Sequence, residues 1–333
     1  MNLKACLAEC LQRGLSLTER PYLALAFELG CEESIVLDLT RELIHEQYIR
    51  SFGAFVDYER LGYEGLLCGI SVPDERVASV AALLHKRHEV THNYLRDHEV
   101  NLWFTALLRD DDERKRFFTE VLDPSECSFV VLTTEARLKL WPTFRFVPRE
   151  FDELDTVENQ TISPQDTPPE AFLTLDEESM RTLALLQRDF PIVSEPFELA
   201  ARKLGRSVPQ LLKLLRELEK SRVLRRIGAS LHHRRVGYNA NALVAWSIND
   251  EDIPQAGETA SEFPWVSHCY VRRVLESTLS FDWPYVLYTM LHAPDDETLS
   301  ERIHLMRKSL EYPNAVILTT LRELKKTRRL LDA

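Results

Sequence analysis

The chain has 333 residues, of which 44% are hydrophobic and 28% charged, a balance typical of a globular protein with two or more domains. The net charge of −12 argues against nucleic acid as the main partner, because phosphate binding needs clustered Lys and Arg. No apolar run could span a bilayer, and the six cysteines form no CxxC pair, so we expect a cytoplasmic protein without disulfides or a zinc site.

The predicted elements fall into five parts. An amphipathic helix opens a helical region, and a region of alternating strands and helices follows. An acidic stretch rich in Pro and Thr then reads as a linker. A second helical region, with Thr174 and Glu177 as a capping-box pattern, precedes a second alternating region. The expected bounds of these parts are 1–62, 63–146, 147–171, 172–237 and 238–333.

The helical and alternating regions are repeated. Nine residues of the stretch 41–63 recur 175 positions later. A second match, at an offset of 176, pairs His92, Tyr94 and Arg96 with His268, Tyr270 and Arg272. Trp103 matches Trp283 once four more residues are inserted in the second copy. Matches at a nearly constant spacing over such a long span do not arise by chance, so the chain is a tandem duplication of roughly 1–146 and 171–333.

Each copy predicts the same fold. In the second copy two helices are joined by a short turn, and the segments RRIGASL and ANALVAWSI then suggest a strand pair, the pattern of a winged helix-turn-helix. The order of elements that follows is βαββαβ, a ferredoxin-like fold. We therefore expect an α+β protein in which a winged helix-turn-helix plus a ferredoxin-like domain occurs twice.

This combination, with RRIGA and VGY as signatures, resembles the Lrp/AsnC family of transcription regulators. The recognition helix of the first copy would be EESIVLDLTRELIHE, which is acidic and apolar. Phosphates would repel such a helix, so we do not expect DNA binding to be the main function. The second copy, RSVPQLLKLLRELEK, is mildly basic and stays open.

Two segments narrow the resemblance. THNYLRDHEVNLWFT and SHCYVRR…DWPYVLYTMLH are similar to signature segments of the siroheme decarboxylases, Lrp/AsnC-like enzymes of alternative heme and heme d1 biosynthesis. One copy resembles each of two subunit types, so the chain looks like a fusion of the NirDL-like kind. The loop VLESTLSF and Val286 depart from the family pattern.

The resemblance implies a carboxy-lyase that removes two acetate carboxyl groups of siroheme as CO2 and yields 12,18-didecarboxysiroheme. The iron tetrapyrrole would be the substrate, with no added cofactor and no metal of the protein's own. An internal pseudo-dimer of the two copies is expected, and a homo-oligomer stays open. The alternatives are a tetrapyrrole-responsive Lrp/AsnC-type regulator and a module that recruits other tetrapyrrole enzymes.

Such a substrate needs three kinds of residue. Arginines would neutralise its carboxylates, with candidates Arg96, Arg272, Arg273, Arg234 and Arg235. Aromatic rings would enclose it, with candidates Trp103, Trp283, Tyr94, Tyr270 and Tyr288. A histidine would donate the proton or ligate the substrate iron, and the candidates are His92, His98, His233 and His268. His292 is a further candidate for binding the substrate. Strand alternation predicts one face for His92, Tyr94, Arg96 and His98.

Overall fold

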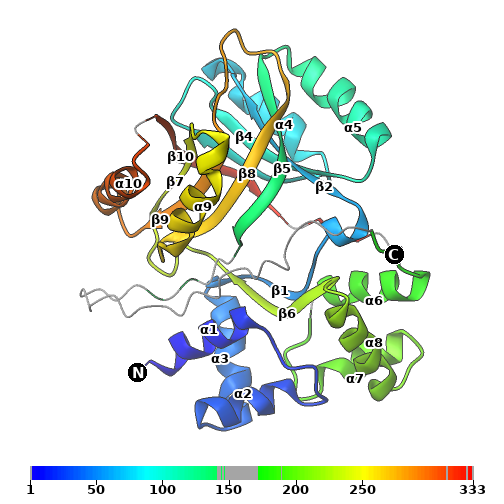
Figure 1. Cartoon of the computed structure of the whole chain (residues 1–333). Coiled ribbons are helices and arrows are strands. Elements are labelled where there is room, and N and C mark those ends of the chain that lie inside the picture. The colour runs from blue at the N-terminus through cyan, green and yellow to red at the C-terminus, as the bar shows by residue number, and fades with distance from the viewer. Residues whose placement is uncertain are drawn as a thin grey trace.

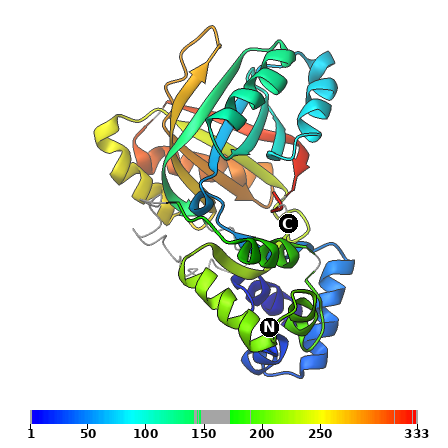
Figure 2. The ribbon, with the colours of Figure 1, turned by 90° about the vertical axis from the view of Figure 1, so that its right-hand side faces the viewer.

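The computed structural model describes residues 2–140, 144, 146, 172–188, 190–312, 314–327 and 329–331. Figures 1 and 2 show two parts, a barrel with helices on its outside and a helical region beneath it. The barrel is closed by eight strands. The linker predicted at 147–171 lies outside the described residues.

The helical region contains one helix-turn-helix unit from each copy. The first is built from α1 (Leu3–Arg13), α2 (Pro21–Leu29) and α3 (Glu33–His45), and the second from α6 (Glu177–Gln187), α7 (Pro196–Lys203) and α8 (Val208–Lys220). α8 begins with a capping box formed by Ser207 and Gln210. The predicted cap of α6 is wrong by two residues, because the side chain of Asp176, not Thr174, accepts from the backbone of Ser179.

The two helical units exchange strands. β1 (Ile49–Val56) pairs antiparallel with β6 (Leu224–Leu231) of the other copy. The expected pairing of RRIGASL with ANALVAWSI is therefore wrong, because β6 pairs with β1 while the ANALVAWSI strand joins the barrel. A Cβ on Gly53 of β1 would lie 2.5 Å from the carbonyl oxygen of Leu186, and one on Gly228 of β6 would lie 2.5 Å from that of Leu11. Only glycine allows each strand to pack this closely on a helix of the other copy.

The barrel contains one βαββαβ unit from each copy, as predicted. The first unit consists of β2 (Glu64–Ile70), α4 (Val77–His85), β3 (Val90–Arg96), β4 (Leu102–Leu108), α5 (Asp111–Phe117) and β5 (Phe129–Leu140). The second consists of β7 (Ala240–Trp246), α9 (Ile253–Glu262), β8 (Val266–Ser277), β9 (Leu287–Ala293), α10 (Asp296–Leu310) and β10 (Ala315–Lys326). The strand orders β3-β4-β2-β5 and β8-β9-β7-β10 are the same, which confirms the duplicated ferredoxin-like fold.

Two pairings between the copies close the barrel and form the internal pseudo-dimer. β5 pairs with β8, and β10 pairs with β3. Apolar residues fill the barrel interior, with Trp103 and Tyr288 1% exposed and Trp283 6% exposed. Tyr94 faces Trp103 across β3 and β4, whereas Tyr270 faces Tyr288 across β8 and β9. The counterpart of Trp103 is thus Tyr288, and the sequence match of Trp103 with Trp283 is wrong.

Candidate active site

Four buried or half-buried histidines gather at the end of the barrel that faces the β1–β6 sheet. His92 lies on β3, His268 on β8 and His292 on β9, and His233 is the second residue after β6. The rings of His233 and His292 are 5.4 Å apart between centroids. The hydroxyl of Ser267 lies 3.0 Å from Nε2 of His292 and 2.8 Å from Nδ1 of His268. We call these four histidines the imidazole cluster.

Burial makes the imidazole cluster neutral in the empty protein. Loss of solvent, and then the positive charge of Lys326, lowers the pKa of His92 and of His233 to about 3. The same two causes lower the pKa of His268 to about 4. Burial and the neighbouring His233 hold the pKa of His292 well below its ordinary value. Uncharged imidazoles can accept protons, and a bound polyanion would raise their pKa values towards neutrality.

The predicted His-Tyr-Arg face exists in both copies. The rings of His92 and Tyr94 stack at 6.4 Å, and those of His268 and Tyr270 at 6.0 Å. The guanidinium of Arg96 lies 5.1 Å from the ring of Tyr94, and that of Arg272 lies 4.8 Å from Tyr270. Each triplet therefore forms one continuous polar row along its strand.

The two arginines of these rows are buried without a carboxylate partner among the described residues. Arg96 and Arg272 are 4% and 8% exposed. Nη1 of Arg96 donates to the carbonyl of Leu318 at 2.8 Å and to Oγ1 of Thr320 at 3.0 Å. Nη1 of Arg272 donates to Oγ1 of Thr134 at 2.9 Å. A buried cation with only neutral partners is costly, and an anionic ligand would offset that cost.

Two basic residues at the cluster were missed by the sequence reasoning. Lys326, the last residue of β10, pairs in register with His92. Arg50 of β1 lies 3.3 Å from both Nδ1 of His232 and Oε1 of Glu323. The signal for Arg50 was its place in the repeat. The predicted last strand, AVILTTL, ended before the KK at 325–326, so Lys326 could have been found only by extending that strand.

Comparison with known proteins identifies the family. The family model of the AsnC-like ligand binding domain matches residues 60–139 and 235–325, and that of the siroheme decarboxylase NirDL-like HTH domain matches 7–50 and 180–225. A siroheme decarboxylase NirDL subunit of Paracoccus pantotrophus is 30% identical over 85% of this chain and 82% of its own. The chain belongs to the siroheme decarboxylase family.

Other members of the family match along nearly the whole chain. The siroheme decarboxylase of Hydrogenobacter thermophilus is 29% identical over 96% of this chain and 91% of its own. A crystal structure of a siroheme decarboxylase NirDL in complex with an iron-uroporphyrin III analogue superposes with a TM-score of 0.71. That match has 25% identity and covers 99% of this chain and 94% of the other. Siroheme decarboxylases are carboxy-lyases, and this chain has the fused two-repeat arrangement of the NirDL-like members.

Several residues predicted for a decarboxylase site lie away from the imidazole cluster. β3 ends at Arg96, and Nδ1 of His98 accepts from the backbone of Val100 at 3.0 Å while its ring contacts Trp283 at 5.9 Å. His98 therefore does not share the face of His92, contrary to the prediction. Trp103, Trp283 and Tyr288 fill the barrel interior, where Nε1 of Trp283 donates to the hydroxyl of Tyr288 at 2.8 Å.

The remaining arginines differ in position. Arg273 points away from the cluster and forms ion pairs with Glu135 at 2.5 Å and Asp250 at 2.7 Å. Arg234 and Arg235 are exposed just after β6. The charge of Arg234 acts on His233, so Arg234 lies at the rim of the cluster. Of the five predicted arginines, the structure thus brings Arg96, Arg272 and Arg234 near the histidines.

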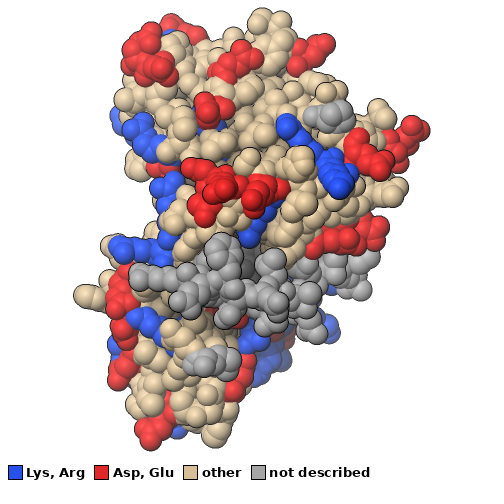
Figure 3. All heavy atoms as spheres, turned by 90° about the vertical axis from the view of Figure 1, so that its left-hand side faces the viewer, with Lys and Arg blue, Asp and Glu red and all other residues tan. Residues whose placement is uncertain are grey.

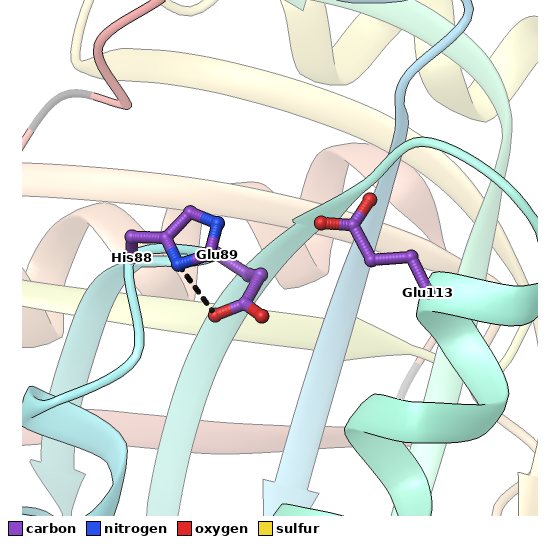
Figure 4. A group of neighbouring side chains, drawn as sticks. All are labelled: His88, Glu89 and Glu113. Atoms are coloured by element: carbon purple, nitrogen blue, oxygen red, sulfur yellow. Dashed lines mark ion pairs between the residues drawn. The ribbon is translucent and has the colours of Figure 1, made fainter. Parts of the chain in front are cut away.

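A second group of ionisable residues lies apart from this site (Figure 4). His88 and Glu89 sit together at the start of β3, and Glu113 reaches towards them from α5. Oε2 of Glu89 is 3.4 Å from Nδ1 of His88, while Oε1 accepts from Arg87 at 2.9 Å. Glu113 accepts from Arg329 at 3.2 Å. Because each carboxylate already has an arginine partner, this group needs no metal ion to neutralise it.

Proposed function

We propose that this chain removes two acetate carboxyl groups of siroheme as CO2 and produces 12,18-didecarboxysiroheme for heme d1 or alternative heme biosynthesis. The observation that carries the proposal is the pair of buried arginines, Arg96 and Arg272. Within the described part of the chain they donate to neutral acceptors only, and they lie beside a cluster of neutral histidines. A polycarboxylate ring would supply the missing negative charge. The relative in complex with an iron-uroporphyrin III analogue binds a ligand of this class.

Each decarboxylation exchanges one CO2 for one proton. The bond between the methylene and the carboxylate carbon breaks, and its electron pair stays on the methylene carbon, where the macrocycle delocalises it. A proton then forms the new methyl C–H bond. The electron-poor iron macrocycle is the substrate, so no further cofactor is required for the electron balance. The protein must hold the carboxylates, exclude water and deliver the proton.

The imidazole cluster is suited to deliver that proton. Nδ1 of His92 lies 2.9 Å from the hydroxyl of Thr91. If this hydroxyl donates to Nδ1, the proton of the neutral ring resides on Nε2. Substrate carboxylates near the ring would raise its pKa, so the imidazolium would form only in the complex. We propose His92 and His268 as proton donors, with His233 and His292 beside them as further donors or ligands of the substrate iron.

The regulator remains the alternative function. The exposed side of α3 carries Asp38 and Glu42, and Glu46 follows its end. Lys4 and Arg41 form ion pairs with these carboxylates, so this side of α3 has no net positive charge to attract the phosphates of DNA. Acidic and basic side chains are interspersed over the face shown in Figure 3. These features favour the enzyme over a DNA-binding regulator.

Anaerobic incubation of the purified chain with siroheme tests the proposal. Mass spectrometry should show products that have lost one and then two molecules of CO2. The His92→Asn variant should lower the rate about 10²- to 10⁴-fold, the usual range for loss of a general acid. Replacement of the exposed His85 serves as the matched control and should leave the rate unchanged. Intact siroheme after incubation with the wild-type chain, together with tight binding to an operator, would favour the regulator.

A further inference from the structure

The two halves of the duplicated site differ in the charges around their histidines. The pairing of β10 with β3 places Lys326 opposite His92, and the equivalent pairing of β5 with β8 places Leu140 opposite His268. In the same two ladders Glu323 faces Tyr94, and Arg137 faces Tyr270. We call the surroundings of His92 the His92 half and those of His268 the His268 half.

The residues that follow the exchanged strands also differ in charge between the two copies. His232, His233 and Arg234 follow β6. The repeat offset of 175 places Asp57, Tyr58 and Glu59 at the corresponding positions after β1. Two carboxylates in the first copy thus correspond to an imidazole and a guanidinium in the second copy. The fold is the same on both sides, so the difference lies in the side chains alone.

The cations of the His92 half have unused hydrogen-bonding capacity. Arg50 has an ion pair with Glu323 at 3.3 Å, but its Nε and Nη1 are buried and have no hydrogen-bond partner among the described residues. Both ring nitrogens of His233, which is 5% exposed, also lack a partner there. Among the described residues, the nearest carboxylate oxygen to Lys326 belongs to Glu323 and lies 3.9 Å away. This half therefore has more positive charge than its own acid can neutralise.

Arg137, the cation that faces Tyr270 in the His268 half, is already neutralised. Arg137 forms ion pairs with Glu59 and, at 3.9 Å, with Asp57. Asp57 also accepts from Arg225 at 2.6 Å. The side chains of Arg137, Asp57 and Glu59 are all less than one-fifth exposed, so solvent screens their charges only in part. Among the described residues, a polyanion entering here would meet the guanidinium of Arg272 but also these two carboxylates, and Leu140 in place of the ammonium of Lys326.

We infer that each chain binds one polycarboxylate ring, in the His92 half, and that Lys326 and Arg50 hold its carboxylates. The inference rests on the proposed function for the class of ligand, and it adds the two residues and the stoichiometry. Lys326 can reach a carboxylate without breaking a close ion pair, and Arg50 can use Nε and Nη1. The His268 half then contributes His268 and Arg272 to the wall of one shared pocket.

Spectral titration of the full chain with iron-uroporphyrin III tests the stoichiometry and the residues together. We expect one ring per chain. Lys326→Leu should weaken binding about 10- to 100-fold, the value of one charge-assisted hydrogen bond. Leucine at this position is compatible with the fold, because Leu140 occupies the equivalent place opposite His268. Lys326→Arg should restore affinity to within about 5-fold, which a purely structural role would not require.

The matched control is Leu140→Lys, which adds the same ammonium to the other half. The ring's carboxylates are held in the His92 half, so we expect the affinity for the ring to change by less than about 3-fold and the stoichiometry to stay at one. Two rings per chain, or equal affinity of Lys326→Leu and the wild-type chain, would overturn the inference. One-ring binding without decarboxylation of siroheme would instead contradict the proposed function and leave the inference intact. A wild-type chain that does not bind the ring would overturn both.

Discussion

Replacing the buried guanidinium of Arg96 should separate binding from stability. Burial lowers the pKa of Arg96 to about 10, and a drop of this size corresponds to roughly 3 kcal/mol of cost for keeping the charge. Arg96→Met would remove that cost and also the two hydrogen bonds to Leu318 and Thr320, worth about 1.5–3 kcal/mol each. These effects partly cancel, so we expect the free energy of unfolding to fall by no more than about 3 kcal/mol.

The same substitution should weaken the ring's binding. Loss of one charge-assisted pair with a carboxylate costs about 10- to 100-fold in affinity. Urea unfolding of the empty protein and spectral titration with iron-uroporphyrin III measure the two quantities on one sample. Arg329 provides the control, because it is also 9% exposed or less but is paired with Glu113 at 3.2 Å. Arg329→Met would strand a buried carboxylate and cost about 3–5 kcal/mol while sparing affinity. If Arg96→Met behaved like Arg329→Met, the guanidinium would be structural.

Three further predictions follow from the site. The pKa values of His92 and His268, about 3 and about 4, lie below that of a histidine in the unfolded chain, so unfolding takes up protons. The free energy of unfolding should therefore fall as the pH drops from about 6.5 towards 4. Urea unfolding at pH 7 and pH 5 measures this fall, and equal stability at the two pH values would contradict the burial argument. His98→Asn should keep the decarboxylation rate within about 3-fold, since His98 contacts Trp283 instead of the cluster; a loss like that of His92→Asn would reinstate the original prediction. Glu323→Gln should tighten ring binding by about 3- to 10-fold in the titration, because it frees Arg50; weaker binding would mean that Glu323 positions Arg50 for the ligand.

Local sequence patterns predicted the fold because the periodicity of a short segment determines whether it forms a helix or a strand. The periodicity of two along THNYLR correctly placed His92, Tyr94 and Arg96 on one face. The same rule failed for His98 because the strand ends at Arg96, where the backbone of Asp97 turns to donate to Thr319 of the other copy. Alternation holds only within a strand, and a contact with the other copy determined where this strand ends.

The missed residues depended on pairings that no local pattern encodes. Lys326 reaches His92 because β10 crosses to the sheet of the first copy, and Arg50 reaches Glu323 because β1 exchanges with β6. The identity of Trp283 was misread for a related reason. Its residue type matched Trp103, but the extra residues of the second copy lie in the loop before β9, so the strand position of Trp103 belongs to Tyr288.

The duplication itself distinguishes structural residues from candidate functional ones. Lys139 donates to the carbonyls of Ser261 and Phe263 at the end of α9, and Lys325 donates in the same way to those of His85 and Arg87 at the end of α4. Both copies need this lysine because both copies have the same helix to cap.

The adjacent position differs, with Leu140 in one copy and Lys326 in the other, although the backbone pairing is the same. The fold places no demand for a charge there, since the first copy forms its ladder with leucine. The half-buried ammonium of Lys326 lowers the pKa of His92, and burial lowers the pKa of Lys326 itself. Both effects mean that keeping this charge costs stability in the empty protein. A costly charge that one copy does without is best explained by a ligand, and a polyanionic ligand would turn that cost into affinity.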